Sequence, residues 1–507
     1  MTRRPSFLFF CADQMQSACL GIHDHPDVRT PNLDRLAREG TSFTRAYCPN
    51  PVCMPSRSSV ITGLTPRGHG VISNGHKLPE QLPTFPGVLA DAGYRTHAAG
   101  KLHLQPFMTG GPASKRCRAH SWESRRDWDS GRIEALPSPY YGFQTSDFVG
   151  GHVDYTFGDY RRWLDAEYPG TWDLLGREHA KARRSDDPSV FTMSIPEELH
   201  YNTWIADRSV AFLDSLRDTE PFMLWCSFPD PHFPFASVAE YRDRYDAASL
   251  TLNPTWNDSI DPTPLLANHR ATWKVLPDFD ERVLRECMAE TYAMIEHLDA
   301  CIGRVLDHLE RTGRADTTVI AFIADHGEYL GTHHLVYKGM WPYEELYRVP
   351  FIWRVPGGLA RGTSDELVSL LDVAPTVYDL AGIDERSARD ANGTWCGSPP
   401  PLAGRSLRGH LTNGATWNDD RAVTVEGCFG GANGAVDVRT IVTDGYTLSV
   451  YAPGEDGVLF DLNNDPNERQ NLWNDPDARD VRESLVLRLV REMAKSDRRD
   501  VPRISGA

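Results

Sequence analysis

The sequence predicts an α/β protein in which a large, mainly parallel sheet is sandwiched by helices. Short apolar runs rich in Val, Ile and Phe alternate along the chain with longer segments of helical periodicity. Such runs are typical of strands buried on both faces, and helices between them indicate the crossover connections of parallel strands. Beyond residue 384 the pattern changes to short strands and one terminal helix, which predicts a small C-terminal α+β unit with an antiparallel sheet.

Four of the predicted strands end in a cluster of polar residues. The strands are expected at residues 6–12, 94–99, 222–228 and 317–324, and the clusters that follow them are Asp13-Gln14, Gly100-Lys101-Leu102-His103, Pro229-Asp230-Pro231-His232 and Asp325-His326-Gly327-Glu328. Ligands of α/β sheets bind outside the carboxyl ends of the strands. We therefore expect the four clusters to converge on one edge of the sheet, the alternative being four unrelated loops.

Helical patterns occupy much of the chain between these strands. They are expected at residues 31–38, 82–92, 206–216 and 282–311, and a helix at 372–383 closes the main domain, which we place at residues 1–383. The C-terminal domain, residues 384–507, is loop-rich up to residue 420 and continues with strands at 422–425, 439–442, 446–451 and 457–461 and a helix at 477–496. Residues 105–200 have little periodicity, and we interpret them as an insertion and substrate lid near the active edge.

Composition and charge exclude several classes of function. A net charge of −17 at pH 7 argues against nucleic acid or an anionic membrane as the main partner. No apolar run reaches the roughly 20 residues of a membrane helix. Arg3-Arg4 before an apolar run imitates an export signal, but Asp13 interrupts that run, so we expect an unexported, cytoplasmic protein. The ten cysteines form no C-x-x-C pair, which indicates a reducing compartment and no disulfide framework.

The most specific local pattern is Cys53-Met54-Pro55-Ser56-Arg57. Pro55 suits the first turn of a helix that Gly63 could end, which puts Cys53 at a helix N-terminus, where backbone N–H groups favour an anion. A lone cysteine there is more often a small buried side chain. These five residues, however, match the C-x-P-S-R signature, and residues 62–70 resemble its second half. The chain therefore resembles the type I sulfatases, in which this cysteine is oxidised to formylglycine.

The resemblance covers nearly the whole chain and implies the fold of the alkaline phosphatase superfamily. It implies one divalent metal ion, held by Asp13, Gln14, Cys53 as formylglycine, Asp325 and His326. The carboxylates are independently expected to bind a hard cation, although a single Asp after a strand is more often a helix cap. The resemblance favours Ca²⁺, while many family members carry a second Asp where Gln14 stands. An imidazole ligand also suits Mn²⁺ or Zn²⁺, and Mg²⁺ is a further alternative.

The resemblance also implies the roles of the remaining site residues, which are Arg57, Lys101, His103, His232 and Lys338. The three cations would neutralise the sulfate oxygens and the charge that develops on them. One hydroxyl of the hydrated formylglycine would attack sulfur, and His232 would protonate the leaving alcohol. His103 would then take the proton of the second hydroxyl as sulfate is expelled. A further family signature is similar to Leu459-Phe460-Asp461-Leu462, with Asp465-Pro466, Glu468 and Asn471-Leu472 after it.

The predicted function is that of a sulfuric ester hydrolase, similar to an arylsulfatase, acting on a small sulfated substrate after maturation by a formylglycine-generating enzyme. One alternative is a phosphonate monoester hydrolase or phosphodiesterase of the same superfamily, although the Lys101–His103 pair favours a sulfatase. Another is a non-catalytic binding protein on this scaffold, which would be expected to lack one of the polar elements, and none is missing. The sequence leaves open whether the ester is an aryl, choline or sugar sulfate, and it does not indicate the oligomeric state.

Overall fold

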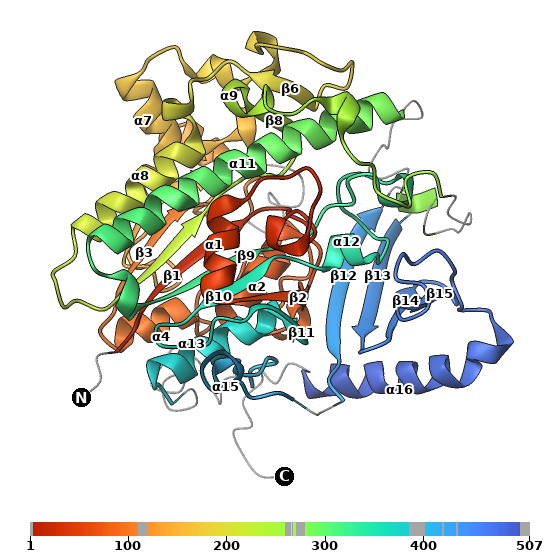
Figure 1. The fold of residues 1–507 in the computed structure, drawn as a ribbon. Coiled ribbons are helices and arrows are strands. Elements are labelled where there is room, and N and C mark those ends of the chain that lie inside the picture. The colour runs from red at the N-terminus through yellow and green to blue at the C-terminus, as the bar shows by residue number, and fades with distance from the viewer. Residues whose placement is uncertain are drawn as a thin grey trace.

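The computed structural model of this chain describes residues 4–109, 120–258, 265, 267–269, 279–384, 401–417, 420–431 and 434–496. Within them lies a central sheet of nine strands between two layers of helices (Figure 1). In spatial order the strands are β11 (Gly362–Ser369), β2 (Thr41–Tyr47), β10 (Phe351–Arg354), β9 (Thr318–Ala324), β1 (Ser6–Ala12), β7 (Phe222–Ser227), β3 (Arg95–Gly100), β4 (Thr145–Gly150) and β5 (Phe157–Gly158).

Most strand pairs of this sheet are parallel, which confirms the predicted fold class. β1 runs parallel to β7 and β9, β3 runs parallel to β7 and β4, and β11 runs parallel to β2. The short strand β10 is antiparallel to both of its neighbours, and β5 is antiparallel to β4. Every residue of β1, β7 and β9 is buried, because helices cover both faces of the sheet there.

Two groups of helices cover the sheet. One group contains α1 (Pro31–Glu39), α8 (Tyr201–Asp214) and the long α11 (Glu281–Arg311), which contacts the other two. The other contains α2 (Cys53–Thr62), α4 (Phe85–Asp91) and α13 (Val373–Ala381), which contact one another. The predicted helix at 82–92 begins only at Phe85, because the side chain of Thr84 caps it by accepting a hydrogen bond from the Gly87 N–H (3.2 Å).

The segment predicted as an insertion, residues 105–200, contributes to the central sheet through β4 and β5. It also contains α6 (Arg125–Asp129), α7 (Asp159–Glu167) and β6 (Val190–Met193), and β6 pairs in parallel with β8 (Phe235–Val238) in a separate sheet. Residues 110–119 of the segment lie outside the described residues. Strand β4 was not expected from the sequence, because its first three residues are polar and only its last three are fully buried.

The C-terminal region forms a four-stranded antiparallel sheet with a helix packed on it, as predicted. Its strands are β12 (Val423–Gly431), β13 (Gly434–Val442), β14 (Tyr446–Ala452) and β15 (Gly457–Asp461), and its helix is α16 (Arg479–Lys495). Leu485 and Leu489 of α16 pack against the buried face of this sheet. β12 and β13 are longer than expected, since their pairing extends to Gly431 and Gly434, in a glycine-rich stretch that has little strand propensity.

Residues of the predicted C-terminal signature connect this sheet to the main domain. The Glu468 carboxylate accepts a hydrogen bond from the backbone N–H of Glu344, which begins α12 (Glu344–Tyr347) (2.8 Å). The Asn471 side chain accepts from the backbone N–H groups of Leu459 and Trp473, each at 3.0 Å. These contacts give both signature residues a structural role at the base of the C-terminal sheet.

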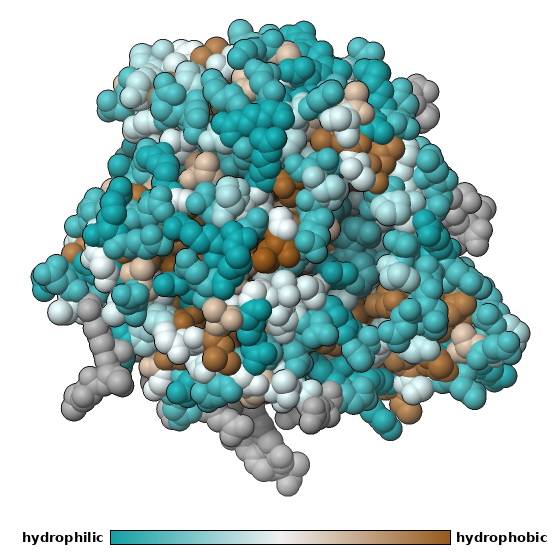
Figure 2. Space-filling model, viewed as in Figure 1, coloured by the Kyte–Doolittle hydropathy of each residue, from teal (hydrophilic) through white to brown (hydrophobic). Residues whose placement is uncertain are grey.

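Hydrophilic side chains cover most of the face seen in Figure 2, with hydrophobic patches near the C-terminal sheet and α16. The eight cysteines in the described part of the chain are all free. Among the described helices, none combines the length and the apolar character that a bilayer span requires.

Candidate active site

The four polar clusters lie together at the carboxyl ends of neighbouring strands. β9, β1, β7 and β3 are consecutive in the sheet, so the residues that follow them meet at one edge. Backbone hydrogen bonds connect the clusters, from Asp13 N–H to Asp230 C=O (3.1 Å) and from Lys101 N–H to Ser227 C=O (2.9 Å). Position 100, just before Lys101, is a glycine because a Cβ atom there would lie 1.9 Å from the backbone oxygen of Ser227. The predicted convergence is therefore present in the structure.

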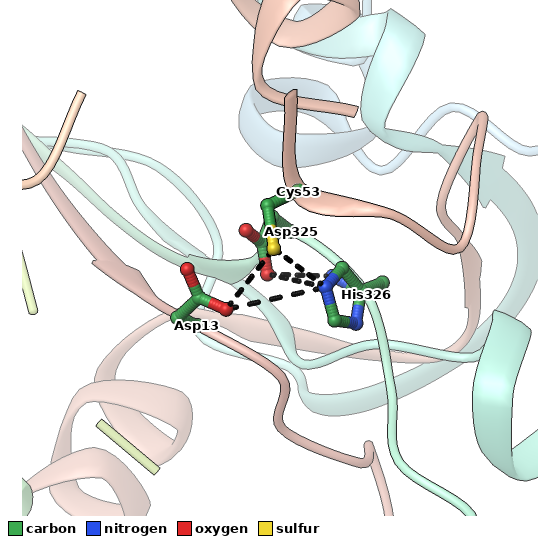
Figure 3. Close-up of side chains that lie close together, drawn as sticks. All are labelled: Asp13, Cys53, Asp325 and His326. Atoms are coloured by element: carbon green, nitrogen blue, oxygen red, sulfur yellow. Dashed lines mark hydrogen bonds and ion pairs between the residues drawn. The ribbon is translucent and has the colours of Figure 1, made fainter. Parts of the chain in front are cut away.

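Cys53 is the first residue of α2, as the sequence predicts, and Gly63 ends this helix in the left-handed conformation with φ 69°. The cysteine side chain points into the centre of the site, toward Asp13 and His326 (Figure 3). Its Sγ lies 3.2 Å from His326 Nε2 and 3.6 Å from Asp13 Oδ1. The residue is 1% exposed, and burial raises the pKa of the thiol to about 11. An unmodified Cys53 would therefore be a protonated and weak nucleophile at neutral pH.

Four buried side chains have the arrangement of a metal site. One ligand atom from each of Asp13, Cys53, Asp325 and His326 lies within 4.8 Å of all the others. The Nδ1 atom of His326 lies 2.9 Å from the Gly327 carbonyl, so it carries the proton and leaves the Nε2 lone pair facing the cluster. Burial lowers the pKa of His326 to about 4, which keeps this ligand neutral. Two carboxylates and one imidazole form a donor set that suits a divalent cation.

Gln14 lies beside this set and takes a left-handed backbone conformation, with φ 61°. Its backbone N–H donates to Asp325 Oδ1 (3.0 Å), and its side-chain oxygen accepts a hydrogen bond from Lys338 Nζ (2.9 Å). The side-chain amide donates to the carboxyl of Glu328, whose pKa is raised to about 8 by burial. The side-chain carbonyl of Gln14 therefore faces Lys338, one of the cations of the site.

Arg57 is buried and makes contacts on three sides. Its Nε donates to Asp325 Oδ2 (2.7 Å) and its terminal nitrogens donate to Asp13 Oδ2 (3.0 Å) and to the Ser227 hydroxyl (2.9 Å). Although burial opposes it, Lys101 and Arg57 together hold the pKa of the Asp13 carboxyl well below its usual range. Arg57 thus connects the two carboxylates and, with Lys101, keeps Asp13 charged.

Lys101 and His103 follow β3 and face different neighbours. The Lys101 ammonium donates to Asp13 and to His152 Nε2 (2.9 Å). The His103 ring stacks on Phe107 at 3.8 Å, and its Nδ1 has no hydrogen-bond partner among the described residues. Burial and the nearby Lys101 hold the pKa of His103 well below its usual value. His103 is therefore a neutral imidazole with a nitrogen available for a proton.

The backbone at His103 is left-handed, with φ 56°, and a buried carboxylate holds it in place. Glu123 accepts hydrogen bonds from the backbone N–H groups of His103 (2.8 Å), Leu104 (2.9 Å) and Gln105 (3.1 Å). The Tyr140 hydroxyl donates to the same carboxylate (2.7 Å). Glu123 therefore determines the direction in which the His103 side chain leaves the strand end.

His232 and Lys338 form a hydrogen-bonded pair beside Cys53. Lys338 Nζ lies 2.7 Å from His232 Nε2 and 3.3 Å from Cys53 Sγ. The Nδ1 atom of His232 donates to the Phe233 carbonyl, so its Nε2 accepts from the lysine. Burial and the neighbouring His152 hold the pKa of His232 well below its usual value. The two residues form a hydrogen-bonded proton path that ends beside residue 53.

His152 was not identified from the sequence. It follows β4, stacks on His232 at 3.6 Å, and accepts the hydrogen bond from Lys101. One ligand atom of His152 also lies within 4.8 Å of Asp13 and His232. The rule that polar residues after parallel strands belong to the site would have found it, but β4 itself was not recognised as a strand.

Comparisons with known proteins agree with this architecture. A family model described as Sulfatase matches residues 5–383, and one described as N-sulphoglucosamine sulphohydrolase, C-terminal, matches residues 331–495. An arylsulfatase of Clostridium perfringens (strain 13 / Type A) is 27% identical and aligns over 97% of this chain and 94% of its own length. A choline-sulfatase of Rhizobium meliloti (strain 1021) is 28% identical and aligns over 94% of this chain and 83% of its own length.

A solved structure shows the fold likeness directly. The phosphonate monoester hydrolase of Agrobacterium radiobacter superposes with a TM-score of 0.77 and covers 97% of this chain and 96% of its own, at 22% sequence identity. At that identity the likeness concerns the fold alone, and it confirms the predicted α/β fold class.

Proposed function

We propose that this chain, which belongs to the sulfatase family, hydrolyses a sulfate monoester with a formylglycine made from Cys53 and one divalent metal ion beside it. Membership of the family and the named relatives make the chain a sulfuric ester hydrolase. The observation that carries the proposed mechanism is the buried cluster of Asp13, Cys53, Asp325 and His326, whose ligand atoms all lie within 4.8 Å of one another. The metal ion, when bound there, supplies charge that activates the attacking hydroxyl of the hydrated formylglycine and balances the sulfate oxygens.

The burial of Cys53 bears on its maturation. At 1% exposure, the side chain is out of reach of another protein in the folded chain. A formylglycine-generating enzyme would therefore act before folding is complete. The raised pKa of the thiol supports the need for modification, since the unmodified group would be a poor nucleophile at neutral pH.

The chain's own residues position the ester and move protons. Lys101 and Lys338 approach the centre from two sides and offer N–H donors to an anion, while Arg57 keeps Asp13 and Asp325 in place. Lys338 can pass a proton through its 2.7 Å contact to His232 Nε2, from which the departing alcohol takes it. His103 accepts a proton during release of sulfate, a role that its Nδ1 supports because this atom has no hydrogen-bond partner among the described residues.

Asp325→Ala is expected to remove the bound metal ion, because it deletes one of two carboxylates and leaves Arg57 without its Nε partner. Metal content per chain, measured by elemental analysis after desalting, should fall from about one to near zero. Asp299→Ala is the matched control, since Asp299 is an equally buried carboxylate that caps the start of α1 by accepting from Leu33 N–H (2.8 Å). Full metal occupancy in the Asp325 variant would exclude this residue as a ligand.

His232→Ala is expected to slow the hydrolysis of esters with poor leaving groups much more than that of good ones. A general acid contributes about 10²-fold or more when the departing oxygen is basic and little when it is not. The measurement is kcat/KM for a series of aryl sulfates whose phenols differ in pKa. The slope of log kcat/KM against phenol pKa should become steeper in the variant, and an unchanged slope would rule out proton donation by His232.

The alternative function is hydrolysis of a phosphonate monoester or phosphate diester. The structural likeness to a phosphonate monoester hydrolase favours it, whereas the pairing of Lys101 and His103 favours a sulfatase. Turnover of an aryl sulfate and of an aryl phosphate diester by one preparation separates the two. A kcat/KM that is higher for the diester would replace the proposed activity.

A further inference from the structure

A cavity of about 670 Å³ opens beside His152 and His232, and its lining includes none of Asp13, Cys53, Asp325 and His326. Both His152 and His232 line it, so an alcohol that takes its proton from His232 occupies this space as it leaves. The other lining residues come from segments far apart in the sequence, around residues 107, 155, 190, 233 and 337. The cavity therefore receives the part of the substrate that differs between one sulfate ester and another.

Six phenylalanine and tyrosine rings line the cavity. The lining rings are those of Phe107, Tyr155, Phe157, Phe191, Phe233 and Tyr337. Tyr337 contacts Phe233 at 4.6 Å between ring centroids, and Phe107 contacts Phe157 at 5.2 Å, so these rings support one another. A wall of this kind binds apolar surface and offers few hydrogen bonds to a ligand.

The polar groups at the wall are engaged by the protein itself. Arg177 donates to the backbone carbonyls of Asp187 (2.7 Å), Val190 (3.0 Å) and Ser185 (3.0 Å). The Asp187 carboxylate accepts from Ser189, and the Ser189 hydroxyl also lies 3.1 Å from the Tyr337 hydroxyl. A sugar, which needs several hydrogen-bond partners for its hydroxyls, would find most of these donors and acceptors already bonded.

A quaternary ammonium is the one rival ligand that the charged and aromatic side chains of the lining could bind. Asp154 lies near Arg125, which attracts its carboxylate, while partial burial raises the pKa of that carboxyl. Arg125 in turn lies over the Tyr155 ring at 4.8 Å. Aromatic faces can bind a cation, but the volume is that of a drug-sized ligand and far exceeds a choline headgroup.

We propose that the natural substrate is the sulfate ester of a bulky apolar alcohol, either a substituted or fused aromatic alcohol or one with a long hydrocarbon chain. This inference rests on the proposed function, because it assigns the alcohol part of the ester that the same site cleaves. The aromatic cavity binds the apolar body, and the clustered cations beside Cys53 bind the sulfate. Specificity then comes from apolar burial in the cavity.

A series of 4-alkylphenyl sulfates, from methyl to butyl, tests this assignment, because their phenols differ little in pKa. Each added methylene that is buried should raise kcat/KM about fourfold, or about 60-fold over the series. Met108→Ser and Tyr155→Ser, at lining residues that are 80% and 55% exposed, should reduce the rise to less than about twofold per methylene. Leu487→Ser on α16, at a residue that is 51% exposed, is the matched control and should leave the rise unchanged.

Binding of the free alcohols, measured by calorimetry, tests the class of ligand without any turnover. 4-Butylphenol should bind at least about tenfold more tightly than choline or glucosamine, from the burial of its alkyl chain. Tighter binding of choline or glucosamine, or a flat alkyl series with normal release of sulfate, would overturn the assignment and leave the proposed function standing. If the chain cleaves the phosphate diester and no sulfate, the proposed function fails, while binding of 4-butylphenol still reports on the cavity.

Discussion

Cys53→Ala is expected to lower kcat for sulfate ester hydrolysis by at least about 10⁴-fold, because it removes the group from which the nucleophile is made. In the active wild-type protein, mass spectrometry of the tryptic peptide of residues 46–57 should find residue 53 as an aldehyde in place of the thiol. Burial raises the pKa of the Cys53 thiol to about 11, so the unmodified group would be a weak nucleophile at neutral pH.

Cys53→Ser gives a second and more specific result. A serine hydroxyl at the same place could attack sulfur, but it has no second hydroxyl with which to expel sulfate by C–O cleavage. A sulfated form of the 46–57 peptide should therefore accumulate in Cys53→Ser and be absent from Cys53→Ala. A fully active preparation in which the Cys53 thiol is entirely unmodified would contradict the central proposal.

His103→Ala is expected to permit attack on sulfur and to block release of sulfate. Removal of a proton acceptor costs about 10² to 10⁴ in the step that it serves. Rapid mixing with an aryl sulfate should therefore show a burst of phenol roughly equal to the enzyme present, followed by slow turnover. A sulfated peptide that contains residue 53 should be trapped in the same experiment.

His410→Ala is a matched control for the loss of a buried imidazole. His410 is as buried as His103, and its ring stacks on Trp417 much as His103 stacks on Phe107, but it lies on α15 (Arg408–Asn413), away from the site. This variant should lose stability without a burst. If His103→Ala likewise lowers stability and turnover together, with neither burst nor trapped adduct, His103 has no separate role in release.

Four of the nine strands in the central sheet, and the helices that cover its faces, were predictable because local pattern encodes them. The strand at 6–12 and the long helix from about 282 to 311 were found to within a residue, since an unbroken apolar run or a long helical period leaves few alternatives. The strands β2, β4, β5, β10 and β11 were not found. β10 has only four residues and β4 begins with three polar ones, so pairing with neighbours, not composition, makes them strands.

The candidate site was predictable to the extent that it lies directly after recognisable strands. Asp13, Lys101, His232 and Asp325 all follow such strands, and the parallel arrangement alone brings them to one edge. His152 was not found in this way because β4, the strand it follows, was not recognised. Glu123 lies before α6 and does not directly follow a strand, so the same rule does not reach it.

The sequence by itself determined which chemical groups stand at the strand ends, where α2 begins and ends, and to which family the chain is similar. These properties depend on residues close together in the chain, through burial, capping and backbone preference. Only the tertiary structure decided that Arg57 connects two carboxylates, that Lys338 contacts His232, and that aromatic rings from five segments form one cavity. Those contacts arise when the whole core packs, because side chains distant in sequence meet only after the sheet and its helices have positioned them.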